Sequence, residues 1–178
     1  MSFVGLPGEG LPVGLIERIR REFRLDWHGI HGAAHWARVM HHGLRIAQVT
    51  GADEQVVRLF AVVHDSQRHD EGRDPGHGAR SADFALALHA DGLLGLDDTR
   101  ADWLAQACLG HSDGHLKANP TIETCWDADR LDLGRVGIRP DPRRLCTAVA
   151  GHPEMIEFAW SWSRLTARRP ATRPGRGE

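Results

Sequence analysis

Apolar residues recur along this chain at the three- and four-residue spacing of amphipathic helices. No run of alternating β-branched residues bounded by hairpin turns interrupts the pattern, so strands are not expected. The sequence therefore predicts an all-α protein. The expected helices cover approximately residues 12–24, 33–49, 53–68, 79–90, 99–110, a stretch from 120 that carries an acidic cluster, 141–150 and 153–167.

The length of 178 residues fits one domain with a tail. We expect the domain to span residues 1–167 and the segment 168–178, which is rich in Arg, Pro and Gly, to be disordered. The 22 basic and 24 acidic side chains give a formal charge of −2, which argues against binding to nucleic acid or to an anionic membrane. With no signal peptide, no membrane span and three scattered cysteines, the expected location is the cytoplasm.

Histidine is unusually frequent, with 12 copies in a chain that has no tyrosine. It is the commonest metal ligand and titrates near neutral pH. His64 and Asp65 end the apolar run 59–63. An ionised carboxylate is costly to bury there unless a cation or several donors compensate, and a metal ion would compensate both side chains. The alternative is that the helix emerges into solvent at Asp65.

The expected helix from residue 120 carries a carboxylate on its apolar face. Asp129 is the position on that face that is not apolar, so its charge is expected to point into the core. Asp127 and Asp132 lie off the centre of the face, and we expect them to be solvated or to support a ligand, with Arg130 as an ion-pair partner. The apolar members of the face are Ile122, Trp126, Leu133 and Val136.

Further histidines lie at or near the ends of other expected helices. His35 shares one face of the helix 33–49 with other residues, and His31 lies four residues earlier on the incoming loop. His77 precedes one expected helix and His111 follows another. Taken singly, His77 and His111 are more typical of surface loops. The residues on the same face as His35 are Val39, His42 and Ile46.

In their order along the chain, these residues resemble the HD-domain superfamily, whose signature is H…HD…D with extra histidines in its dinuclear members. Residues 35–39 (HWARV) resemble the family's H-x-x-R-V segment, and residues 127–132 (DADRLD) resemble a segment of its small bacterial phosphohydrolase branch. Residues 77–82 (HGARSA) and His111-Ser112 resemble its third and fourth histidine segments. The full order is His35, His64, Asp65, His77, His111 and Asp129.

The resemblance covers residues 27–140 and implies an HD-domain helical bundle with a metal centre. The ligands of a first divalent ion would be His35, His64, Asp65 and Asp129. A second ion would use His77 and His111, with Asp65 bridging the two, and the resemblance leaves one ion and two ions equally open. Mixed imidazole and carboxylate ligation suits Mn, Fe, Co, Ni or Zn.

The chemistry implied by the resemblance is hydrolysis of a phosphate ester of a small molecule, with nucleotides as the first class to test. A divalent ion lowers the pKa of bound water and polarises a phosphoryl oxygen. The predicted catalytic residues are Asp65, His111 and Arg68, and other candidates for the acid that protonates the leaving group are His31, His115 and Asp113. The predicted substrate-binding cations are Arg38, Arg80 and Lys117. For each arginine, a solvated or ion-paired surface is the simpler explanation.

Two other functions are compatible with the same ligands. Some relatives in the superfamily with six ligands use a diiron centre and O2 to oxidise a substrate. A non-catalytic sensor of metal or nucleotide would keep the ligands for binding alone. The three functions differ in whether phosphate is released, O2 is consumed, or a ligand is bound without turnover.

Overall fold

The computed structural model describes residues 10–167, and within this range every regular element is helical, which confirms the all-α prediction. The predicted tail 168–178 lies outside the described residues. No helix in the described range is long and apolar enough to cross a bilayer. The elements are α1 (Leu15–Glu22), α2 (Ala33–Thr50), α3 (Glu54–Val63), α4 (His77–Ala90), α5 (Asp98–Gly110), α6 (Pro120–Leu131), the 3-10 segments Asp132–Val136 and Pro142–Arg144, and α7 (Pro153–Ala167).

The helices begin and end at residues that can satisfy their free backbone groups. Helix α2 ends at Gly51, whose φ of 72° lies in the left-handed region that glycine adopts at low cost. The Asp53 carboxylate accepts the N–H of Val56 at the start of α3, and the Asn119 side chain accepts the N–H of Ile122 at the start of α6. These local signals explain why most expected helices form close to their predicted positions.

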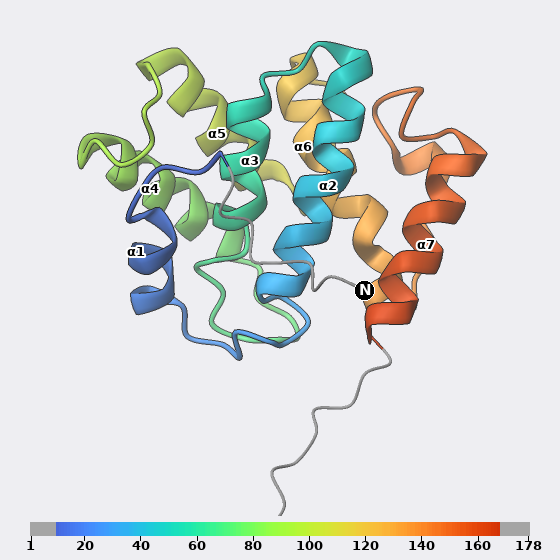
Figure 1. Ribbon diagram of the computed structural model, residues 1–178, viewed down its shortest axis with the longest axis horizontal. Coiled ribbons are helices and arrows are strands. Elements are labelled where there is room, and N and C mark those ends of the chain that lie inside the picture. The colour runs from blue at the N-terminus through green and yellow to red at the C-terminus, as the bar shows by residue number, and fades with distance from the viewer. Residues whose placement is uncertain (1–9, 168–178) are drawn as a thin grey trace, which may run out of the picture.

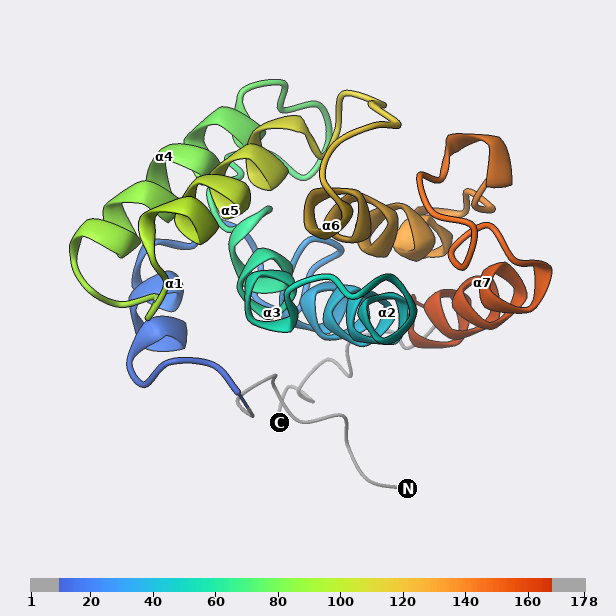
Figure 2. The same ribbon diagram turned by 90° about the horizontal axis from the view of Figure 1, so that it is seen from above.

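Helices α2 and α3 form a hairpin at the centre of the molecule (Figure 1). Helix α6 packs against both of them, and the pair α4 and α5 packs on the side of α3 (Figure 2). Helix α7 lies on the opposite side, next to α2, and contacts the 3-10 segment Asp132–Val136 that follows α6. This arrangement brings the ends of α2, α3 and α6 to one place.

The core is aliphatic and aromatic, and two clusters fasten its parts together. In the larger cluster the Trp36 ring packs edge-on against Phe23 and Trp27, with ring centroids 5.1 and 5.2 Å apart. The smaller cluster attaches α7 to α2 and α6, and its members are Ile46, Leu131, Leu145, Ala150, Met155, Ile156 and Ala159. Burial of these surfaces from water holds the bundle together.

The prediction of a helix over residues 141–150 is wrong. Only Pro142–Arg144 forms a 3-10 turn there, and the chain then continues as irregular backbone. The buried Asp127 carboxylate accepts the backbone N–H groups of Cys146 at 2.7 Å and of Thr147 at 2.8 Å. A side chain on α6 therefore satisfies donors that a helix would have used internally.

Two helix ends also differ from the prediction. Helix α3 stops at Val63 because tight turns follow, in which the N–H of Ser66 donates to the Val63 carbonyl. Helix α6 gives way to a 3-10 segment at Asp132, which changes the helical register. Val136, predicted to face the core, is consequently 44% exposed.

One buried side chain conflicts with the apolar packing between α2 and α7. Neither ring nitrogen of His42 has a hydrogen-bond partner among the described residues. Its ring lies against Phe158 and Trp162 of α7, with centroids 6.1 and 5.5 Å away. Burial lowers the pKa of His42 to about 3, because the charged imidazolium would be poorly solvated there.

We predict that His42 makes the fold acid-sensitive. The unfolded chain binds a proton at His42 as the pH falls below about 6.5, whereas the folded protein does so only near pH 3, so stability is lost between these values. Urea denaturation at about pH 7 and at about pH 4.5 measures how far the unfolding free energy falls as the pH is lowered. This fall should be about 2 to 3 kcal/mol smaller in His42→Leu than in the wild type. The exposed His28→Gln is the control and should lose as much as the wild type; equal losses in all three proteins would contradict the prediction.

Candidate metal centre

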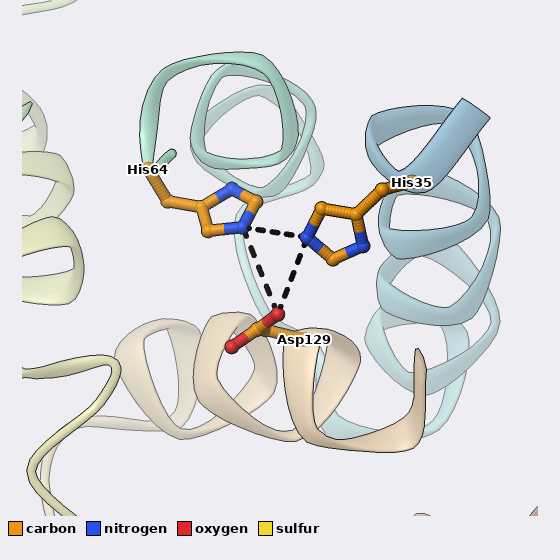
Figure 3. Close-up of side chains that lie close together, drawn as sticks. All are labelled: His35, His64 and Asp129. Atoms are coloured by element: carbon orange, nitrogen blue, oxygen red, sulfur yellow. Dashed lines mark hydrogen bonds and ion pairs between the residues drawn. The ribbon is translucent and has the colours of Figure 1, made fainter. Parts of the chain in front are cut away.

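Three side chains from three helices converge in the core. His35 comes from α2, His64 directly follows α3, and Asp129 comes from α6 (Figure 3). The Nε2 atoms of His35 and His64 lie 3.1 Å apart. The Oδ1 atom of Asp129 lies 3.4 Å from the first and 3.7 Å from the second. Both imidazoles are fully buried, so the three ligand atoms face one another away from solvent.

A second pair of imidazoles lies beside the first. The Nε2 atoms of His77, at the start of α4, and His111, at the end of α5, are 2.9 Å apart. Asp65 lies between the two pairs: its Oδ1 is 3.5 Å from the Nε2 atoms of both His77 and His111. Its Oδ2 is 3.6 Å from His35 Nε2 and 3.7 Å from His64 Nε2. One carboxylate oxygen therefore faces each pair.

The opposite ring nitrogens determine which tautomer each histidine adopts. The Nδ1 atom of His64 lies 3.0 Å from the carbonyl of Phe60, and that of His111 lies 2.7 Å from the carbonyl of Cys108. A carbonyl oxygen can only accept, so Nδ1 carries the proton in both rings. His77 Nδ1 likewise meets a carbonyl, that of Asp74.

The fourth histidine follows the same rule with a carboxylate. His35 Nδ1 donates to Asp132 Oδ2 at 2.7 Å. In their neutral forms all four rings thus present an unprotonated Nε2 to the centre, and two facing lone pairs cannot hydrogen-bond to each other. A proton on one ring, or a metal ion between the members of each pair, resolves this conflict.

The distances and the donor set fit divalent metal ions. At metal–ligand distances of about 2.0 to 2.1 Å, neighbouring ligand atoms are about 2.8 to 3.4 Å apart in octahedral or tetrahedral geometry. The His35–His64 distance of 3.1 Å and the His35–Asp129 distance of 3.4 Å match this range. Asp129 Oδ1 is also buried without a hydrogen-bond partner among the described residues. Imidazole with carboxylate suits the transition metals named above.

The electrostatics favour the protonation states that bind metal at Asp65, Asp129 and His64, whereas at His111 the Asp65 carboxylate outweighs the effect of burial and raises the pKa. Burial alone would raise the pKa of Asp65, but the neighbouring imidazoles outweigh burial and hold that pKa well below its ordinary value. The same balance, with His64 as the first contributor after burial, lowers the pKa of Asp129. Burial lowers the pKa of His64. Near neutral pH the carboxylates are charged and the His64 imidazole is neutral, as ligands must be.

Asp132 holds the His35 ring in place. Its carboxylate also accepts hydrogen bonds from Arg38 Nε at 2.6 Å and from Ser163 Oγ at 2.6 Å, so these polar groups are paired with one another in the core. Asp132 and Asp127 are both fully buried, so neither is solvated, which was one of the two expectations. Asp132 instead supports a predicted ligand, His35, which was the other expectation. Arg38, predicted to bind substrate, is instead committed to this buried ion pair.

A cavity of about 750 Å³ opens beside the centre. Four of the six predicted ligands contribute to its wall: Asp65, His77, His111 and Asp129. Five arginines also line it: Arg68, Arg130, Arg135, Arg139 and Arg144. Its apolar wall consists of Leu116, Leu133, Ile138, Pro140 and Leu145. The centre is therefore reached through a cavity that combines positive charge with an apolar surface.

The other predicted site residues lie at different distances from this cavity. Arg68 lines it and donates to Asp65 Oδ1 at 3.4 Å. Arg80 is outside the lining and pairs with Asp74 at 2.6 Å, the residue whose carbonyl orients His77. Lys117 lines a separate hollow with His115. The candidate acid His31 is paired with Glu71 at 2.6 Å, and the candidates Asp113 and His115 are exposed.

Sequence reasoning did not identify four of the cavity arginines: Arg130 was expected to pair with an acid, and Arg135, Arg139 and Arg144 were not considered. Their signal was the basic segment 135–144 directly after the acidic cluster. That segment was expected to enter a helix, whereas it forms the irregular wall of the cavity. Its position depends on the bonds from Asp127, which the sequence does not reveal.

We predict that Asp132→Asn weakens metal binding by about 10- to 100-fold, because the neutral amide accepts the His35 Nδ1–H more weakly and its NH2 group can donate to Nδ1 and favour the opposite tautomer. Asp127→Asn is the matched control, because it also removes a buried carboxylate of the same acidic cluster. The Asp127 carboxylate contacts Cys146 and Thr147 rather than a predicted ligand, so this variant should lose stability and keep its metal affinity. Both are measured by metal titration after circular dichroism has shown folded protein, and equal affinity in Asp132→Asn and the wild type would refute the role of Asp132.

No family model matches the chain, and no curated protein matches it. Among solved structures, it is similar to the crystal structure of a predicted HD superfamily hydrolase from an uncultured Thermotogales bacterium. The two chains are 25% identical, the TM-score is 0.63, and the similarity covers 85% of this chain and 88% of the other. Together with the converging histidines and aspartates, this similarity supports membership of the HD-domain superfamily.

Proposed function

We propose that the protein is a metal-dependent phosphohydrolase that cleaves a phosphate ester of a small molecule, with nucleotides as the first class to test. The observation that carries this proposal is the presence of two imidazole pairs, with Nε2 atoms 3.1 and 2.9 Å apart, on either side of the Asp65 carboxylate. The similar solved structure is described as a predicted hydrolase, which supports the reaction class.

The arrangement supports two divalent ions. His35, His64 and Asp129 would hold the first, and His77 and His111 the second, with one oxygen of Asp65 on each. A bound divalent ion lowers the pKa of water and polarises a phosphoryl oxygen, which supplies the nucleophile and part of the charge stabilisation. In this proposal His111 is a ligand rather than the acid, because its free nitrogen faces Asp65.

Two arginines are placed to bind the phosphoryl group. Arg68 lies 3.4 Å from Asp65, and the carbonyls of Asp70 and Gly72 hold the rest of its guanidinium. Arg135 lies 3.9 Å from Asp129 Oδ1 and also lines the cavity. Guanidinium groups fixed before the substrate arrives can orient phosphoryl oxygens and stabilise charge that develops on them.

The cavity favours phosphate chemistry over oxidation. A diiron oxidase would use the same six ligands, but five arginines in the cavity wall indicate an anionic substrate. A sensor would bind such an anion without turnover. The arginines thus support the phosphohydrolase over the oxidase. Measurement of phosphate release, O2 consumption and ligand binding separates all three functions.

We predict about two metal ions per chain in the wild-type protein and about one in His77→Gln, because that substitution removes a ligand of the second ion alone. Metal content is measured by mass spectrometry after dialysis. His89→Gln, on the same helix but paired with the exposed Asp98, is the control and should keep both ions. One ion in the wild type, unchanged in His77→Gln, would contradict the second site.

We also predict that the metal-reconstituted protein releases phosphate from at least one member of a nucleotide and sugar-phosphate panel without O2. Asp129→Ala should lower this rate at least about 1,000-fold, because it removes a ligand of the first ion. Asp102→Ala, an exposed aspartate on α5, should not change the rate. O2 consumption by the iron-loaded protein without any phosphate release would establish the oxidase, and binding without either reaction would establish the sensor.

A further inference from the structure

Arg130 is a buried cation without a counter-ion. Its side chain is on the cavity wall and the residue is 9% exposed. Its guanidinium donates to the carbonyls of Arg144 at 3.0 Å and His115 at 2.7 Å, and to Cys146 Sγ at 3.4 Å. All three acceptors are neutral. No ion pair to Arg130 occurs in the part of the chain that the structure describes; besides the three acceptors, its guanidinium lies over the Trp126 ring at 5.7 Å, so no carboxylate is paired with its charge.

The other arginines of the cavity differ in this respect. Arg68 and Arg135 reach the carboxylates of metal-centre residues, and Arg139 pairs with Glu157 at 2.8 Å. Arg144 is exposed, lines the cavity and makes no ion pair within residues 10–167, although the nearby Asp141 carboxylate, which also lines the cavity, attracts its charge. Because Arg130 donates to the Arg144 carbonyl, the two residues are neighbours. They form a cationic pair separate from the arginines at the metal centre.

The wall that carries this pair is held in place before any ligand arrives. Arg130 connects α6 to two irregular segments through its bonds to His115 and Arg144. Asp127 holds the second segment through the backbone of Cys146. A charged site fixed by neutral hydrogen bonds keeps its net charge for an incoming anion and requires little rearrangement. Its apolar surroundings in the cavity, such as Leu145, lower the competition from water.

We propose that Arg130 and Arg144 form a second anion subsite, so that the substrate carries two phosphate groups: one bound at the metal centre and one at this pair. The placement of one phosphate at the metal centre rests on the proposed phosphohydrolase function. The placement of the other at this pair rests on the charge of Arg130, which no carboxylate pairs. The substrate class is therefore a bisphosphorylated small molecule, with its carbon skeleton against the apolar wall of the cavity.

The test compares affinities for two matched pairs of probes. The full chain, as purified, is titrated by calorimetry with adenosine 5′-monophosphate and adenosine 3′,5′-bisphosphate, and with glucose 6-phosphate and glucose 1,6-bisphosphate. Phosphate release is measured on the same mixtures, and KM replaces the dissociation constant wherever a probe is turned over. We expect about tenfold or greater preference for the bisphosphate in at least one pair, because a charge-assisted contact is gained.

The variant Arg144→Gln should reduce this preference to about threefold or less. Because the Arg144 side chain is exposed, the substitution should leave the fold intact. Arg21→Gln removes the same charge from the exposed face of α1 and should keep the wild-type preference. Arg130→Gln, checked by circular dichroism, should behave as Arg144→Gln does. Equal affinity for both members of each pair in the wild type, or an equal preference in Arg144→Gln and Arg21→Gln, would overturn the proposal.

The two proposals fail in different ways. Preference for a bisphosphate without phosphate release would leave the anion subsite in place and remove the hydrolase. Phosphate release from monophosphates and bisphosphates with equal KM would leave the hydrolase and remove the subsite. An increase in salt should reduce the bisphosphate preference if it is electrostatic, and a salt-independent preference would count against the arginine pair.

Discussion

The whole arrangement depends on one constraint: four buried imidazoles use their Nδ1–H groups on fixed acceptors and therefore direct their Nε2 atoms at one another. His64, His77 and His111 are oriented by backbone carbonyls of their own helix ends or turns, and His35 by Asp132. Such a set is unfavourable by itself because the lone pairs face each other without a proton between them. The Asp65 carboxylate between the pairs adds negative charge, so cations are the natural complement of the site.

Helix α6 and the turn after it connect this centre to the cavity. Asp129 points to the first imidazole pair, while Asp132 orients His35 and compensates the buried Arg38. On the other side, Asp127 and Arg130 fasten the segment that forms the cavity wall. One short acidic stretch thus contributes both to the candidate metal centre and to the wall of the cavity beside it, so a single element connects the two.

The helices and the ligand candidates could be predicted from sequence because both depend on local patterns. Helical spacing marked α2, α3 and α6, and a carboxylate on the apolar face of α6 marked Asp129. Contacts between distant segments were out of reach: Arg38 meets Asp132 from 94 residues away, and that contact removes it from the cavity. The wall around Arg144 could not be predicted either, since its backbone is satisfied by Asp127 rather than by a helix.

The most direct test of the central claim is anomalous diffraction at the absorption edge of the bound metal, from crystals of the metal-loaded full chain. The account predicts two peaks, one between His35 and His64 and the other between His77 and His111, with one oxygen of Asp65 on each. A single peak, or two peaks with Asp65 turned away from one of them, would contradict the bridging role on which the proposed chemistry rests.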